Sequence, residues 1–158
     1  MKASLNRIIL YVQDVERLAT FYQDAFQLPV VEEIKGEWAV LRVGVCELAL
    51  HRVGKPYRVA DASSWKVETN AKMVISVTRE LKDLRAELID KGVPMGRIKS
   101  YPGLTGPLCD GTDPEGNVFQ LAQSLDSSRY RAATAGDRGQ PLLRRLPNSV
   151  PVGLWSKD

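Results

Sequence analysis

Apolar and polar residues in the first part of the chain follow two different spacings, and each spacing predicts one kind of element. Residues 5–12 form a short run rich in β-branched and aromatic side chains, which is typical of a strand. From 15 to 26 the apolar positions recur every three or four residues, which predicts a helix with one apolar face and Asp14 as its N-cap. Further strand-like runs lie at 30–34, 38–43 and 46–51. The predicted order is β-α-β-β-β.

The same order recurs after a connector at 52–70. A strand is predicted at 73–77 and an amphipathic helix at 80–91, and strand candidates follow at 95–100, 108–111 and 118–122. Neither half can bury its sheet alone, so the repeat predicts one body. We therefore expect an α+β domain at 1–123, in which two βαβββ modules (5–53 and 71–123) form an open, curved mixed sheet around a cleft.

Charge is distributed unevenly between this body and the residues that follow it. The chain has 44% hydrophobic and 26% charged residues, as ordinary soluble globular proteins do. Its formal net charge of +3 is too small to indicate a nucleic-acid surface, and the basic excess lies in 124–158. That segment also contains prolines and large apolar residues. We expect a C-terminal arm that docks on its own body or on a partner subunit, with a role that the sequence leaves open.

Cysteine usage and hydropathy indicate the compartment. Cys46 and Cys109 form neither a disulfide framework nor a metal-binding pair in the sequence, and Cys46 is expected to be a buried, inert thiol. The N-terminus becomes charged too early for a secretory signal, and no apolar run is long enough to cross a bilayer. The sequence therefore predicts a cytoplasmic protein without a nucleic-acid or membrane partner.

Three segments carry a resemblance to a known superfamily. They are IILYVQDVER at 8–17, FYQDAFQL at 21–28 and TDPEGNVFQL at 112–121. In this order they resemble the glyoxalase/bleomycin resistance protein/extradiol dioxygenase superfamily, whose fold is called the vicinal oxygen chelate fold. The resemblance covers about residues 5–123. It implies the two-module fold, a cleft for a small molecule and, as is common in the superfamily, a homodimer.

In metal-dependent members of the superfamily, four strand positions supply the metal ligands, usually His, Glu or Gln. The resemblance places these positions at Arg7, Glu47, Lys72 and Gln120. A guanidinium and an ammonium have no lone pair for a metal ion and repel a dication. We therefore expect no metal cofactor. Instead, Arg7 and Lys72 would fill the volume of the metal, with Glu47 as counter-ion and Gln120 as hydrogen-bond partner.

Strand alternation adds candidate ligand-binding residues to the same face of the sheet. Tyr11 shares the face of Arg7, and His51 shares that of Glu47. His51 is the only histidine. It is either a substitute metal ligand or general base, or a partly solvated residue at a strand end. Tyr11 and Trp38 either line a pocket for a flat organic ligand or pack without contacting one.

The leading hypothesis is a metal-free member of the superfamily that binds a small, planar or anionic organic molecule in the cleft, with no catalytic residue assigned. The ligand-binding residues would be Arg7, Tyr11, Trp38, Glu47, His51, Lys72 and Gln120. One alternative is a glyoxalase-like lyase or dioxygenase in which Glu47, Gln120 and His51 hold a divalent metal ion (Mn, Fe, Ni, Zn or Mg). Another is a structural or interaction dimer without a ligand.

Overall fold

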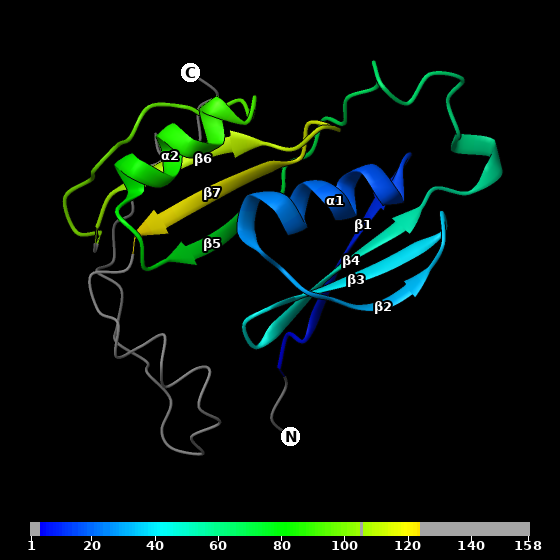
Figure 1. Cartoon of the computed structure of the whole chain (residues 1–158), viewed down its shortest axis with the longest axis horizontal. Coiled ribbons are helices and arrows are strands. Elements are labelled where there is room, and N and C mark those ends of the chain that lie inside the picture. The colour runs from blue at the N-terminus through cyan, green and yellow to red at the C-terminus, as the bar shows by residue number, and fades with distance from the viewer. Residues whose placement is uncertain (1–3, 105, 124–158) are drawn as a thin grey trace.

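Two modules follow one another along the chain, as the sequence predicts (Figure 1). The computed structural model describes residues 4–104 and 106–123, and the predicted arm at 124–158 lies outside them. Module 1 consists of β1 (Arg7–Val12), α1 (Val15–Phe26), β2 (Val30–Ile34), β3 (Trp38–Val43) and β4 (Cys46–Arg52). Module 2 consists of β5 (Met73–Val77), α2 (Leu81–Asp90), β6 (Leu108–Thr112) and β7 (Val118–Gln123). The connector between them contains a short 3₁₀ helix, η1 (Lys55–Tyr57).

Module 1 contains the helix that the sequence predicts residue for residue. The Asp14 side chain accepts a hydrogen bond of 3.0 Å from the Arg17 backbone N–H and so caps the first turn of α1. Gln27 adopts a left-handed conformation, with φ of 55°, that ends the helix. The sheet order is β1-β4-β3-β2, with β1 and β4 parallel and the other pairs antiparallel. The sheet is therefore mixed, as predicted.

Module 2 has a smaller sheet with the order β5-β7-β6. At 95–100, where a strand is predicted, the chain makes only isolated bridges. They join Met95 to Gly111 and Lys99 to Leu108. Gly96 and the exposed Arg97 offer little side chain to bury against the sheet, so this segment does not form a continuous ladder with β6. The described residues thus form a four-stranded and a three-stranded sheet, where the sequence predicts a single one.

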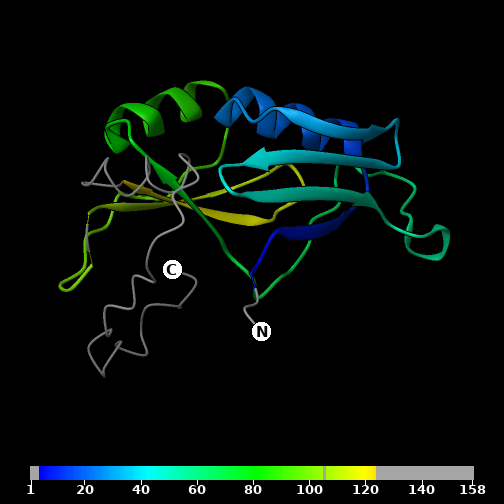
Figure 2. The same cartoon turned by 90° about the horizontal axis from the view of Figure 1, so that it is seen from below.

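Each helix covers one sheet, and both helices lie on the same side of the two sheets (Figure 2). The core of module 1 consists of Val12, Val15, Leu18, Ala19, Tyr22, Ala39, Leu41, Leu48 and Leu50. The core of module 2 consists of Ala25, Leu81, Leu84, Leu88, Val93, Cys109, Phe119 and Leu121. Phe21 and Phe26 of α1 pack against both cores, so this helix joins the modules. Among the described residues, no helix is both long and apolar enough to span a bilayer.

The two cysteines differ in their surroundings. Cys109 is 1% exposed, and burial raises the pKa of its thiol. Cys46 is only half-buried, because it begins β4 directly after the exposed Gly44–Val45 turn. This corrects the expectation that Cys46 is a buried thiol.

A buried polar loop fastens module 2 to the start of α1. Glu115 is fully buried, and its carboxylate accepts hydrogen bonds of 2.9 and 2.8 Å from the backbone N–H groups of Gln13 and Asp14. Asp113, also buried, accepts a hydrogen bond of 2.9 Å from the Tyr22 hydroxyl. Burial raises the pKa of the Glu115 carboxyl and of the Tyr22 hydroxyl. Because these donors belong to module 1, the loop holds the two modules together.

Candidate functional site

The face of module 1 opposite α1 presents a row of three rings. Tyr11 in β1, His51 in β4 and Trp38 in β3 are direct cross-strand partners. The ring centroids of Tyr11 and His51 are 5.3 Å apart with a tilt of 32°, and those of Trp38 and His51 are 5.3 Å apart in an edge-to-face arrangement. Tyr11 is 63% exposed. The structure therefore brings three of the predicted ligand-binding residues together on an accessible face.

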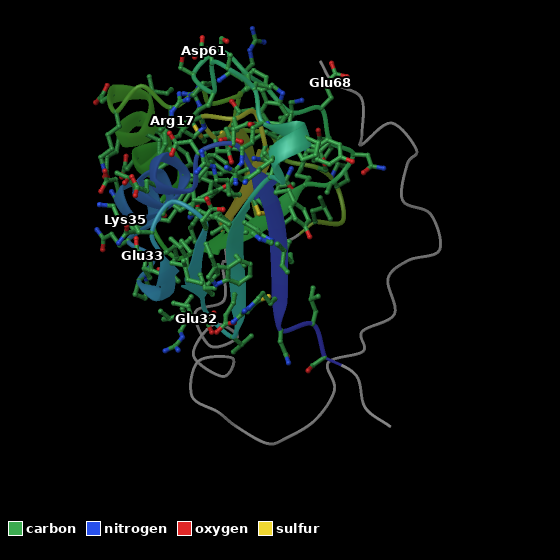
Figure 3. All side chains as sticks on the ribbon, turned by 90° about the vertical axis from the view of Figure 1, so that its right-hand side faces the viewer. Arg17, Glu32, Glu33, Lys35, Asp61 and Glu68 are labelled. Atoms are coloured by element: carbon green, nitrogen blue, oxygen red, sulfur yellow. The ribbon has the colours of Figure 1, made fainter. Side chains whose placement is uncertain are left out.

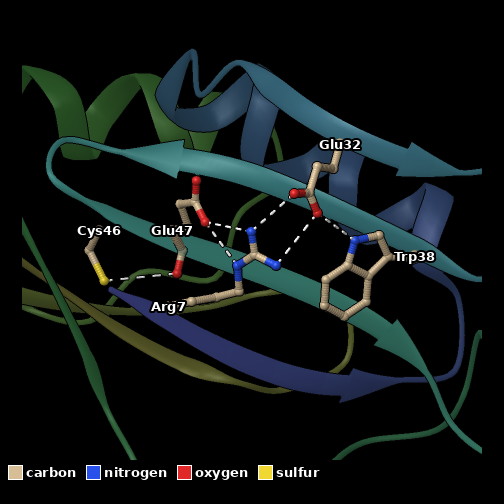
Figure 4. A network of polar contacts seen from close by, with 5 residues as sticks. All are labelled: Arg7, Glu32, Trp38, Cys46 and Glu47. Carbon is tan, nitrogen blue, oxygen red and sulfur yellow. Dashed lines mark hydrogen bonds and ion pairs between the residues drawn. The ribbon is translucent and has the colours of Figure 1, made fainter. Parts of the chain in front are cut away.

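Towards the other end of these strands, Arg7 is held between two carboxylates (Figure 4). Its Nε donates to Glu47 Oε2 at 2.8 Å, and its Nη2 lies 2.7 Å from the same oxygen. Nη1 and Nη2 donate to the Glu32 carboxylate at 3.5 and 3.3 Å. The guanidinium carbon also lies 5.6 Å from the centre of the Trp38 ring, within cation–π range. The hydrogen bond to Glu47 is the main cause that raises the pKa of Arg7.

Glu32 belongs to this group although the sequence did not single it out. Its Oε2 accepts a hydrogen bond of 3.2 Å from Trp38 Nε1, and this bond, followed by that from Arg7, lowers the pKa of Glu32. Figure 3 shows Glu32 apart from Glu33, the next residue of β2. The pairing of β2 with β3 shifts register between Val30 and Glu32. Simple alternation along the sequence could not have assigned Glu32 to this face, because such a shift changes which residues share a side.

Module 2 holds a second polar group, centred on Asp110. The Lys72 ammonium lies 3.1 Å from Asp110 Oδ2, and the Gln120 amide donates to Asp110 Oδ1 at 2.8 Å. Asp110 is absent from the predicted site, although it is the direct antiparallel partner of Gln120. Placing β6 and β7 in register as a hairpin would have revealed it. Lys72 and Gln120 are thus brought together through a residue that the sequence motifs did not identify.

The four positions that the sequence resemblance aligns with metal-ligand positions are divided between these two groups. Arg7 bonds Glu47 on module 1, while Lys72 and Gln120 both contact Asp110 on module 2. Within 4–104 and 106–123, no group of three or more His, Cys, Asp or Glu side chains is placed to hold a metal ion. Two of the four positions are cations, and Glu47 Oε2 is occupied by the guanidinium. This donor set does not fit a divalent metal ion.

A groove of about 450 Å³, here called the intermodule groove, lies between the modules. Its walls are residues 24–28 at the end of α1, 43–45 at the β3–β4 turn, 74–79 of β5 and beyond, and Leu84 and Glu87 of α2. The row of Tyr11, His51 and Trp38 does not line this groove. The candidate ligand site therefore lies on an open sheet face, separate from the groove.

Solved structures share this fold over nearly their whole length. Lactoylglutathione lyase from Agrobacterium tumefaciens has a TM-score of 0.61 and 16% identity, covering 77% of this chain and 94% of its own. FosX, a fosfomycin resistance protein from Listeria monocytogenes, has a TM-score of 0.62 and 15% identity, covering 83% and 99%. TnmS3, an antibiotic binding protein from Streptomyces sp. CB03234, has a TM-score of 0.58 and 19% identity, covering 78% and 97%. No model of a protein family and no curated protein matches the sequence.

These neighbours are vicinal oxygen chelate proteins, so the resemblance seen in the sequence is confirmed at the level of the fold. The α+β class and the βαβββ module pattern are confirmed with it. At these identities the similarity establishes the fold alone. The chemistry of the site must therefore be argued from the residues of this chain.

Proposed function

We propose that this chain, which has the vicinal oxygen chelate fold, is a metal-free member of that superfamily and binds a small planar organic molecule on the open face of module 1. The observation that supports the proposal is the row of Tyr11, His51 and Trp38. The ring planes of Tyr11 and His51 differ by only 32°, so the two rings offer a nearly continuous flat surface. The Trp38 ring is edge-to-face with His51 and borders this surface on one side. A flat ligand stacked on such rings gains roughly 0.5–1.5 kcal/mol per aromatic pair beyond the burial of its area.

The charged groups beside this row indicate how the polar part of a ligand would be met. Arg7 already donates to two carboxylates, and Lys72 is paired with Asp110. An anionic substituent would have to displace a carboxylate from one of these pairs. By contrast, Glu47 Oε1 accepts no hydrogen bond from the described residues and can receive one from a ligand. We therefore place planarity ahead of negative charge as the property that this site selects.

A metal-dependent lyase is the competing assignment, because one similar structure is a lactoylglutathione lyase. In metal-dependent members of the superfamily four strand positions supply the ligands, and in this chain Arg7 and Lys72, which cannot bind a metal ion, stand at two of them. A binding role, which is the role named for TnmS3, needs no metal ion. The proposal therefore includes neither a metal cofactor nor a catalytic residue.

A second copy of the chain is proposed as the cover of this face. Small-molecule sites bury most of the ligand surface, and the row lies on an open sheet rather than in the intermodule groove. A homodimer would supply the missing wall. The cytoplasm is the proposed location, and the two free cysteines, Cys46 and Cys109, support it because reduced thiols are usual there.

Thermal-shift measurements on the full chain with a panel of flat aromatic compounds test ligand binding. We expect at least one compound to raise the melting temperature, because a ligand that binds only the native state stabilises it. Tyr11→Ala and Trp38→Ala should each weaken binding about tenfold, equivalent to about 1.4 kcal/mol. Tyr57→Ala, which removes a 75% exposed tyrosine from the connector, is the matched control and should change nothing. A panel without any stabilising compound would contradict the proposal.

Metal analysis of protein purified without chelators separates the binding role from the lyase. We expect much less than one equivalent of Mn, Fe, Ni, Zn or Mg. A near-stoichiometric metal that disappears in Glu47→Ala would overturn the metal-free assignment. Sedimentation of the same sample tests the second copy, and a monomer at all concentrations would exclude it as the cover.

A further inference from the structure

The intermodule groove has apolar walls that the described residues leave uncovered. Val45, at the turn of module 1, is 72% exposed, and Val74, in β5 of module 2, is 60% exposed. Phe26, Leu28 and Val43 line the same groove. Single exposed valines are ordinary on a protein surface. Here the exposed residues come from both modules and face one groove, which is the arrangement expected of a docking surface.

One wall of this groove is the free edge of β5. The consecutive residues 74–79 all line it, whereas a strand presenting one face would contribute every second residue. In the described sheet β5 is the edge strand beside β7, so its outer edge carries backbone N–H and C=O groups outside the ladder. Such an edge can accept an extended segment as an additional strand.

The chain leaves the described fold one strand away from this edge, on the paired side of β5. Gln123, the last described residue, pairs with Val77 of β5, and its side-chain oxygen accepts a hydrogen bond of 3.0 Å from the Leu81 backbone N–H. Val77 itself lines the groove. The residues after Gln123 therefore start about one strand spacing, ~4.8 Å, from a groove wall. The stretch 124–141 could reach roughly 60 Å when extended, so distance does not restrict where the following segment docks.

Residues 142–146 have the sequence that an edge of this kind requires. LLRRL stands between Pro141 and Pro147 and contains neither proline nor glycine, so each of its backbone N–H groups can take part in pairing. In an extended conformation its side chains alternate, and each face then includes at least one leucine. The segment can therefore place a leucine towards Val45 and Val74 in either register.

The charges of the groove are complementary to the two arginines of this segment. Asp24 and Glu87 line the groove. Glu87 is already paired with Arg79 at 2.8 Å and with Lys91 at 2.8 Å. The Asp24 carboxylate forms no ion pair with any described residue, so it is the carboxylate that an incoming arginine would meet.

We propose that residues 142–146 add to the free edge of β5 and fill the intermodule groove of the same molecule, with leucine against Val45 and Val74 and arginine against Asp24. The docked segment contacts both modules and holds them at one angle. It leaves the row of Tyr11, His51 and Trp38 accessible, so the inference does not depend on the proposed ligand.

Limited trypsin digestion of the full chain tests this docking. Cleavage after Arg144 and Arg145 should be at least ~10-fold slower than cleavage after Arg138, because a docked segment is cut only when it opens. Val45→Asn and Val74→Asn should each abolish that difference. Ile34→Asn is the matched control: it changes a 64% exposed apolar residue of β2 outside the groove and should leave the difference intact.

Three outcomes would overturn the proposal. The first is equal cleavage at the three arginines in the unaltered chain, and the second is protection that persists in both groove variants. The third is protection that disappears on dilution together with a halved sedimenting mass, which would assign the groove to a second copy. Asp24→Asn tests the charge contact separately. In this variant the protection of Arg144 and Arg145 from trypsin should fall several-fold, and the protection that remains should not change with salt concentration.

Discussion

The Glu115 carboxylate accepts hydrogen bonds from the backbone N–H of Gln13, a residue 102 positions earlier in the chain. Both oxygens take part, at 3.0 and 2.9 Å, and the Asp14 N–H adds a third bond of 2.8 Å. The turn of module 2 is thereby tied to the junction of β1 and α1. Tyr11 lies two residues before Gln13, so this relationship also positions the aromatic row relative to module 2.

We predict that Glu115→Ala lowers the free energy of unfolding by about 3 kcal/mol, because it leaves buried backbone donors without acceptors. Chemical denaturation of the full chain measures the change. Glu68→Ala is the control, since Glu68 is exposed, and it should alter stability by less than about 0.5 kcal/mol. A loss of similar size in both variants would contradict the role of Glu115.

The same carboxyl predicts a pH dependence. Burial, the largest cause, raises its pKa in the folded chain above the ordinary value of about 4.3. A raised pKa means that the folded state binds the proton more tightly than the unfolded state. The stability from this group is therefore fully present below about pH 4.3 and is lost as pH rises through the folded pKa.

Unfolding measured against pH for the unaltered chain and for Glu115→Gln isolates this contribution, because the glutamine does not titrate. The unaltered chain should lose stability relative to the variant as pH rises from about 4 through the folded pKa. Parallel curves would show that the buried carboxyl has an ordinary pKa.

Gly111→Ala should destabilise the fold by about 2 kcal/mol through overpacking. A Cβ at Gly111 would lie 2.4 Å from the Phe119 ring and 2.6 Å from Met95 Sδ, which the core of module 2 cannot accommodate without moving. Gly54→Ala is the control, because its Cβ would meet only ordinary contacts at 3.8 and 3.9 Å. Thermal unfolding of both variants provides the comparison, and equal melting temperatures would refute the crowding at Gly111.

Trp38→Phe should raise the pKa of Glu32 towards its ordinary value. The hydrogen bond from Trp38 Nε1 is the largest cause of the lowered pKa, and phenylalanine keeps a ring but cannot donate. Carbon-detected NMR titration of the Glu32 carboxyl measures the shift. Tyr11→Phe is the control and should leave the pKa of Glu32 unchanged, because Tyr11 is not among the residues that shift it.

The helix of module 1 could be predicted to the residue because its signals are local. Asp14 caps the first turn, and the apolar spacing from Val15 to Phe26 repeats once per turn. The segment at 95–100 has strand-like residues as well, yet it forms only isolated bridges. Whether this segment pairs depends on the position and side chains of β6 in the folded chain, and no local pattern contains that information.

The sequence could place those candidate-site residues whose side of the sheet depends only on alternation along a single strand. Tyr11 and His51 were placed on one face by counting, and the register of β1 with β4 aligns them. Glu32 and Asp110 were missed, because each enters the site through the register of a neighbouring strand. Those two carboxylates change the chemistry, since they neutralise the cations that the sequence offered to an anionic ligand.

The sequence by itself determined the order of the elements, except at 95–100, and the duplicated pattern, because periodicity and capping are properties of neighbours along the chain. Its resemblance to the superfamily places Arg7 and Lys72 at two positions that supply ligands in metal-dependent members. Only the tertiary structure decided that the sheets stay separate, that Glu32 joins Glu47 in holding Arg7, and that the buried Glu115 ties the modules together. These contacts join residues 25 to 102 positions apart. Their energies depend on distance and burial in the folded chain, which no local pattern encodes.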